Sequence, residues 1–309
     1  AIVSPTAYNS ICEFLGANWY ALLGTVVIAV FAVIHIFYAV WLTLQNRKAR
    51  GNERYAIAKR PKAVEWSSQN MLVLGIVVLA FLVVHFIQFW AKMQMAEIAG
   101  TVEALPPAAG TLFLQEAFGQ PWTLVVYAVG FVALWFHLTH GFWSMFQSVG
   151  WDNKVWMNRL KCIGNWWVSI VVALFLAEAI VFTVRAHEKF YLTDEALREQ
   201  YKDMIVPMLE EDFGPDADQL GAQIEMSPYG QVSMGLRQMH SQMANQLEQV
   251  NTPEGKEMVK GNPEMASQIE ELQKRTDALE NVVKLFDYLE SADNKPENLM
   301  PASAGNQPY

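Results

Sequence analysis

The chain has 309 residues, of which 52% are hydrophobic and 17% charged, and its formal net charge is −9. It contains only two cysteines, Cys12 and Cys162, which excludes a disulfide framework and a cysteine-based zinc site. No Cys-x-x-Cys-His sequence occurs, so covalent attachment of a c-type haem is also excluded. Residues 1–190 hold 13 Lys/Arg against 9 Asp/Glu, whereas residues 191–309 hold 9 against 22. This asymmetry predicts two parts in different surroundings.

Four stretches of the first part are long and apolar enough to cross a membrane, whose hydrocarbon core of about 30 Å needs roughly 20 residues of helix. They are Trp19–Thr43, Gln69–Lys92, Pro121–Phe146 and Trp166–Thr183. None has Lys or Arg in its interior, and tryptophans lie near their ends, as is typical of membrane interfaces. We therefore expect an all-α transmembrane helical bundle rather than a soluble one.

The charges of the loops predict how the bundle is oriented. The loop between the first two spans is strongly basic, with Arg47, Lys48, Arg50, Arg54, Lys59, Arg60 and Lys62. The loop before the fourth span is also basic, whereas the loop between the second and third is mostly acidic. Because basic loops stay inside, the first and third of these loops should be cytoplasmic. A multi-pass protein of the cytoplasmic (inner) membrane is expected, with residues 1–18 and the C-terminal tail on the outer or periplasmic side.

Four of the six histidines lie within the spans: His35, His85, His137 and His140. Ionisable residues inside a membrane are costly and are usually functional, although a histidine can also serve as a structural hydrogen bond between helices. At 1.5 Å per residue, His35 and His137 both lie about 12–13 Å from the cytoplasmic end, and His85 lies about 11 Å further out. Two imidazoles facing each other across a bundle can ligate a six-coordinate haem. The spacing therefore predicts a haem between His35 and His137.

The other two intramembrane histidines have less defined roles. His85 has no partner at its own level, so it is either structural or paired with a residue of a helix outside this sequence. His140 lies one turn past His137 on the same face. We interpret it as a residue that contacts the ligand or a haem propionate; the alternative is that it replaces His137 as the ligand.

Three segments carry a resemblance to a known family: the run at Ala17–Arg50 (ANWYALLGTVVIAVFAVIHIFYAVWLTLQNRKAR), VEWSSQNM at Val64–Met71, and FHLTHGFWSMFQSVGW at Phe136–Trp151. They resemble the di-haem cytochrome b subunit of succinate:quinone oxidoreductases, a family that includes fumarate reductases. The resemblance covers roughly residues 8–190. It implies five transmembrane helices and two b-type haems, held by four histidines.

By this resemblance, His35, His85 and His137 correspond to the ligands on the second, third and fourth helices. The second and fourth ligands share the haem on the cytoplasmic side, and the third pairs with a histidine of the first helix at the outer haem. That first helix is missing from these residues. We therefore expect residues 1–18 to be an external segment that follows it, residues 19–190 to be the haem-binding bundle, and residues 191–309 to be an acidic extension.

The resemblance further implies a membrane anchor for a flavoprotein and an iron–sulfur subunit, within a succinate dehydrogenase or fumarate reductase whose dicarboxylate chemistry is on a partner subunit. Electrons would pass between quinone, expected to be menaquinone, and the iron–sulfur subunit. Glu13 and Gln88 are candidate quinone contacts by location only. Some menaquinol-linked members have a glutamate two residues before the fourth ligand, where this chain has Trp135, so that proton path is not transferred. No nucleic-acid partner is expected.

The extension, residues 191–309, departs from the family pattern. An apolar stripe predicts a helix, and consists of Ile269, Leu272, Thr276, Leu279, Val283 and Phe286. Thr252-Pro253-Glu254 and Asn262-Pro263-Glu264 are typical of helix starts. We expect breaks at Gly214-Pro215 and Ser227-Pro228, and a disordered end after Pro296.

Two functions of the extension are considered. Its Met234, Met239, His240 and Met243 could bind copper, but their helical spacing favours packing. Its acidic surface could also dock a basic external electron carrier through electrostatic steering.

Two other functions are considered for the bundle. One is a di-haem anchor of another respiratory complex, such as a hydrogenase, formate dehydrogenase or nitrate reductase. The HLTHGFWS stretch and the long basic loop argue against it. The other is a non-redox scaffold or transporter whose histidines are structural, but no inverted repeat or broken span is visible.

Overall fold

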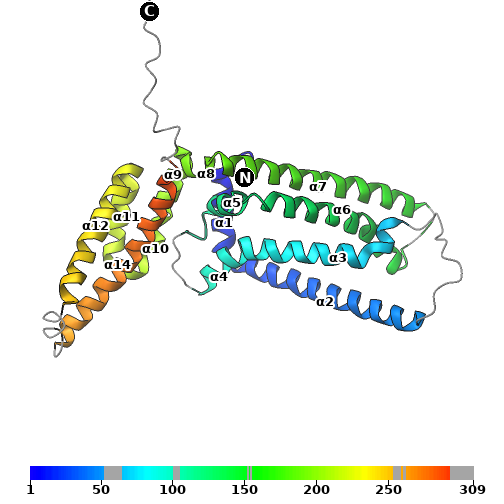
Figure 1. Cartoon of the computed structure of the whole chain (residues 1–309), viewed down its shortest axis with the longest axis horizontal. Helices are drawn as coiled ribbons and strands as arrows, with labels where there is room; N and C mark the ends of the chain where they lie inside the picture. Colours follow the sequence, from blue (N-terminus) through cyan, green and yellow to red (C-terminus); the bar gives the residue numbers. More distant parts are fainter. Residues whose placement is uncertain are drawn as a thin grey trace, which may run out of the picture.

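The computed structural model describes residues 1–51, 65–99, 105–151, 153, 155–252, 259 and 262–292, and within these residues every regular element is a helix. Figure 1 shows four long helices side by side, with the helices of the C-terminal part beside one end of them. The four are α2 (Trp19–Arg50), the run Trp66–Met95, α6 (Thr123–Ser148) and α7 (Trp156–His187), and all are long and apolar enough to cross a membrane. The predicted all-α fold and its four spans are confirmed.

The long helices extend beyond their predicted ends because polar flanking residues suit helix termini. The second run is continuous from α3 (Trp66–His85) through a π-helical turn, η1 (Phe86–Trp90), into α4 (Ala91–Ala99). Helix α2 ends with basic residues in its last turn, where cations interact favourably with the helix dipole. Helix α7 begins at Trp156 because the Asn153 side chain accepts hydrogen bonds from the first backbone N–H groups, those of Val155 and Trp156.

Helix α6 lies between α3 and α7 and packs closely against both. Gly130 of α6 permits the close approach, since a β-carbon there would lie 2.4 Å from the ring of Phe81 on α3. Helix α2 is different, because none of its residues is buried. It lies at the edge of the bundle, as Figure 1 shows, and its apolar surface is open to lipid or to another membrane component.

The two ends of the bundle have different structures. At one end, here called the basic end, α2 finishes with Arg47, Lys48 and Arg50, and α3 and α7 begin. At the other end, here called the capped end, three short helices pack together: α1 (Pro5–Gly16), α5 (Gly110–Phe118) and α8 (Phe190–Thr193). Eight of the nine residues of α5 are buried, so this helix forms the centre of the capped end.

A buried amide joins these helices. Asn9 of α1 is fully buried, and its side-chain oxygen accepts from both the backbone N–H and the hydroxyl of Thr111, each at 2.9 Å. The residue that precedes α5 makes no side-chain cap, so Asn9 caps this helix from another part of the chain. The amide nitrogen of Asn9 donates to Gln200, and the Thr111 hydroxyl lies 2.7 Å from that of Tyr201. One network therefore connects α1, α5 and the start of the extension.

In its described residues, the extension after α8 contains α9 (Glu195–Asp203), α10 (Ile205–Phe213), α11 (Pro215–Met226), α12 (Tyr229–Val250) and α14 (Pro263–Glu290). The predicted breaks are confirmed: Gly214 has a φ of 52° between α10 and α11, and Ser227-Pro228 separates α11 from α12. The Asn262 side chain caps α14, with proline in its first turn, as predicted. The expectations for Thr252-Pro253-Glu254 and for the chain after Pro296 lie outside the described residues.

The core of the extension lies between α10, α12 and α14. Thr276, Leu279 and Phe286 of the predicted stripe are buried, but Val283 is only half-buried, and Val282 takes its place as a fully buried residue. The difference arises because α14 contacts α8 as well as α10 and α12, so its buried face is wider than a single heptad stripe. On α12, Met239 and Met243 pack against this core, whereas Met234 is 66% exposed.

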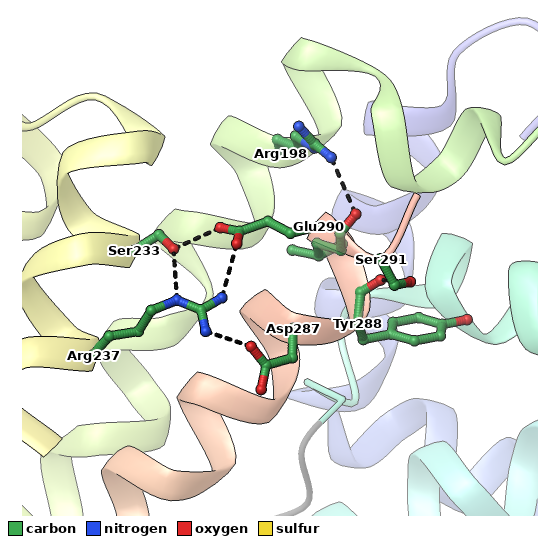
Figure 2. Close-up of polar contacts among 8 residues, drawn as sticks. Arg198, Ser233, Arg237, Asp287, Tyr288, Glu290 and Ser291 are labelled. Carbon is green, nitrogen blue, oxygen red and sulfur yellow. Dashed lines mark hydrogen bonds and ion pairs between the residues drawn. The ribbon is translucent and has the colours of Figure 1, made fainter. Parts of the chain in front are cut away.

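Polar side chains fix the helices of the extension to one another. Figure 2 shows Arg237 of α12 paired with Asp287 and Glu290 of α14, while the Ser233 hydroxyl donates to Glu290 at 2.6 Å. Lys202 of α9 is buried, and its ammonium group donates to Glu199 and to the backbone oxygens of Glu225 and Ser227 at the end of α11. It thereby satisfies carbonyl groups that the end of a helix leaves unpaired.

Candidate functional site

The structure brings two of the predicted ligands together. The rings of His35 on α2 and His137 on α6 lie with their centroids 6.1 Å apart and their planes at 79°. An imidazole nitrogen bonds a first-row metal ion at about 2 Å, so two rings on opposite sides of one metal have centroids about 6 Å apart. The observed separation therefore fits a bis-imidazole haem, the arrangement that the depths of the two histidines predict.

A cavity of about 400 Å³ lies beside this pair, between α2 and α3. Its walls are almost entirely apolar and include small residues such as Ala32, Ala39 and Gly75. Gly75 lies against the His137 ring, since a β-carbon there would be 3.5 Å from Cε1. Apolar walls with a few convergent polar groups are typical of cofactor sites. The side chains of α2 that face α3 therefore line a space suited to a flat apolar group.

The hydrogen bonding of His137 is incomplete within the described residues. Nδ1 of His137 is buried and has no hydrogen-bond partner within the described residues. A histidine that joined two helices structurally would place its ring nitrogens on a neighbouring helix. For Nδ1 of His137 the described residues provide no such partner, and the atom lies against Gly75 of α3, where a β-carbon would be 3.9 Å away.

His140 occupies a different environment near the basic end. Its Nδ1 lies 3.1 Å from a carboxylate oxygen of Glu65, the residue that precedes α3. The other oxygen of Glu65 lies 3.6 Å from the Lys161 ammonium group, which stands 3.7 Å above the ring of Trp143. His137 rather than His140 faces His35, so the geometry favours the first of the two interpretations of His140.

His85 lies at the second level of the bundle, toward the capped end. Its Nδ1 is 3.1 Å from the hydroxyl of Tyr127 on α6, and Tyr127 precedes His137 by ten residues. The two levels are therefore about 15 Å apart along α6, somewhat more than the 11 Å that the spans alone predict. His85 is exposed on the bundle surface, and the rings beside it in the described part of the chain are Phe81, Phe89 and Tyr127.

A chain of hydrogen bonds continues from His85. The Tyr127 hydroxyl donates to the Gln88 amide oxygen at 3.0 Å, and the Gln88 amide nitrogen lies 3.5 Å from the Thr123 hydroxyl. The Thr123 hydroxyl in turn donates to the backbone oxygen of Ala117 at 2.6 Å. Gln88 lies in the π-helical turn that follows His85, and such turns are frequent at functional sites.

Gln88 also lines a cavity of about 350 Å³ near the capped end. Lys92 and Glu116 form an ion pair in its wall, and Trp122 lies beside them. The structure does not bring Glu13 to this cavity, because that residue is exposed on α1 and absent from the cavity lining. Of the two candidate quinone contacts, Gln88 therefore lines this cavity and Glu13 does not.

Sequence reasoning did not find Lys92, Glu116, Tyr127 or Thr123 as site residues. A signal for Lys92 exists, because it follows His85 by seven residues and so lies on the same helix face. Tyr127 has no comparable signal, because it lies ten residues before His137 on α6 and therefore about 80° away from it around the helix. Glu116 and Thr123 have no such signal, since their positions depend on how α5 packs against the run that carries Gln88.

Comparisons of the chain with known proteins give no match to a protein-family model, a curated protein or a solved structure. What the sequence and the fold establish is a multi-pass membrane protein built as an all-α bundle, with the rings of His35 and His137 close together beside an apolar cavity.

Proposed function

We propose that this chain is the di-haem cytochrome b membrane anchor of a succinate:quinone oxidoreductase. The observation that carries the proposal is the pair His35 and His137, whose ring centroids lie 6.1 Å apart beside an apolar cavity. The resemblance of three segments of the sequence to this family agrees with that geometry. The dicarboxylate chemistry belongs to a partner subunit.

In this proposal His35 and His137 hold the inner haem, and His85 supplies one ligand of the outer haem. Haem b, when bound, accepts and releases one electron at its iron. The apolar walls of the cavity exclude water, and the small residues Ala39 and Gly75 leave room for a flat group. The second ligand of the outer haem comes from a helix outside these residues.

The ends of the bundle suggest where the partners bind. By the positive-inside rule, Arg47, Lys48 and Arg50 favour a cytoplasmic position for the basic end. The flavoprotein and iron–sulfur subunits then dock at this end, near the inner haem. The extension and the cavity beside Gln88 face the outer side.

The cavity beside Gln88 is the best candidate for the quinone. It is lined by apolar side chains together with the Gln88 amide and the Lys92–Glu116 pair, which can donate and accept hydrogen bonds. A quinone has an apolar ring and two carbonyl acceptors. Gln88 and Lys92 are therefore suited to orient its head group.

A reduced-minus-oxidised spectrum of the purified full-length complex tests the proposal, with haem quantified per copy of this subunit. We expect about two b-type haems in the unaltered complex. His137→Ala should leave one haem, whereas His240→Ala, a substitution in the extension, should leave both. A complex without a b-type spectrum would refute the electron-transfer function, and unchanged haem content in His137→Ala would refute the assigned ligand.

A further inference from the structure

In the hydrogen-bond chain that begins at His85, the group at the far end determines which atom donates and which accepts at each step. The chain ends at the backbone oxygen of Ala117, which can only accept, so the Thr123 hydroxyl must donate its single proton there. Thr123 is fully buried, which leaves its oxygen as an acceptor for the next member of the chain, Gln88.

The orientation of the Gln88 amide follows from this anchor. Its NH₂ group faces the Thr123 oxygen, and its carbonyl oxygen accepts the proton of the Tyr127 hydroxyl. A flipped amide would place its oxygen against the oxygen of Thr123, where no proton remains to be shared. Only one orientation of Gln88 is therefore compatible with the whole chain.

The same logic reaches the imidazole. The Tyr127 hydroxyl has one proton, which it donates to Gln88, so it can only accept from His85. Nδ1 of His85 must then carry its proton, and in a neutral imidazole Nε2 is left with its lone pair. His85 makes no other hydrogen bond within the part of the chain that the structure describes. Nε2 is therefore available as a ligand.

We propose that Tyr127 is a positioning residue for His85, and that the chain from Ala117 through Thr123, Gln88 and Tyr127 holds His85 as the Nδ1-protonated tautomer with Nε2 presented to haem iron. This inference rests on the proposed function. Hydrogen bonds of this kind fix the orientation of a metal-bound histidine and raise its basicity. The ring of Tyr127 also packs against Phe81 and Phe131, so its hydroxyl and its ring have separable roles.

Tyr127→Phe in the full-length complex tests the proposal, because it keeps the ring and removes only the hydroxyl. Loss of such a partner costs about 10–100-fold in affinity for the bound metal group, so the outer haem should pass faster to a haem-free acceptor protein. The midpoint potential of the outer haem should rise, because a less basic ligand stabilises the ferric state less. Its low-spin ferric EPR signal should shift, and the inner haem should not change in any of the three measurements.

Thr123→Val provides a second variant that does not touch His85. It removes the anchor of the chain, so the potential and EPR signal of the outer haem should shift in the same direction as in Tyr127→Phe, but by less. Thr139→Val is the matched control, because among the described residues the Thr139 hydroxyl bonds to the backbone of its own helix alone, at Trp135 and Phe136. It should leave both haems unchanged.

The outcomes separate this inference from the proposed function. An outer haem unaffected by Tyr127→Phe, or equal effects on both haems, would overturn the positioning role while leaving the cytochrome assignment in place. An unaltered complex without b-type haem would remove the proposed function, and this inference with it.

Discussion

The dependence of the capped end on Asn9 can be tested by replacing this residue with leucine, which is similar in size but has no polar atoms. Asn9 is fully buried and accepts two hydrogen bonds from Thr111. In the variant, the Thr111 hydroxyl keeps Tyr201 as a partner, but its backbone N–H loses its only hydrogen bond at a position with no exposure. An unpaired buried donor costs about 1–3 kcal/mol.

This free energy should appear as faster local opening of α5. A cost of about 1–3 kcal/mol corresponds to about 5–150-fold in an equilibrium constant. Hydrogen exchange of the α5 amides in the full-length protein should therefore accelerate by a factor in that range, while α6 and α7 keep their protection. Ser10→Ala is the control, because Ser10 is exposed; its hydroxyl donates to the Thr6 backbone oxygen of its own helix and accepts from Gln200, each at 3.3 Å. Unchanged exchange of α5 in Asn9→Leu would refute the idea that Asn9 caps this helix.

Three further predictions concern the cavity and the extension. Gly75→Leu should fill the space beside His137 and remove the proposed inner haem. Gly75→Ala should retain this haem, because its added β-carbon lies at an ordinary contact distance of 3.5 Å from the His137 ring. Haem content per subunit is the measurement, and a fully loaded Gly75→Leu variant would contradict the reasoning. Lys202→Met should lower the stability of the extension by about 1–3 kcal/mol, because it leaves carbonyl groups at the end of α11 unpaired. Hydrogen exchange of the α11 amides measures this loss. Unchanged protection of these amides would show that water replaces the ammonium group. The hydrogen bond from Lys202 holds the pKa of Glu199 below its ordinary value of about 4.3, so the stability that this bond contributes is present above that pH and is lost as the pH falls through the lowered folded pKa. In Glu199→Gln, the free energy of unfolding should therefore fall less steeply with decreasing pH than in the unaltered protein. An identical slope in denaturation measurements at several pH values would exclude this contribution.

The parts of the fold that depend on composition and periodicity could be predicted from the sequence. Four charge-free apolar runs predict four spans, and the depths of His35 and His137 along their helices predict that they lie at one level. The breaks at Gly214 and at Ser227-Pro228 follow from local backbone preferences, and the structure has them where they are expected. Each of these features is determined within one segment of the chain.

The features that were missed depend on contacts between distant segments. Asn9 caps a helix that begins 101 residues later, and no local pattern links an asparagine in one helix to the first turn of another. The His85–Tyr127 contact depends on the rotation of α3 relative to α6 and on the π-helical turn after His85. Val282 is buried in place of Val283 because α14 packs against α8 as well as α10 and α12, which a single-helix pattern cannot reveal.

The way α14 closes the extension has a consequence for how the protein is made. Arg198 donates to the backbone oxygen of Leu289 across 91 residues, and Lys189 reaches that of Ser291 across 102. Helices α10 and α12 bury their apolar faces largely against α14, the last of the described helices to be synthesised. During translation these apolar faces therefore remain exposed until α14 has been synthesised. A chain truncated before α14 should therefore be an aggregation-prone, incompletely folded product rather than a shorter folded domain.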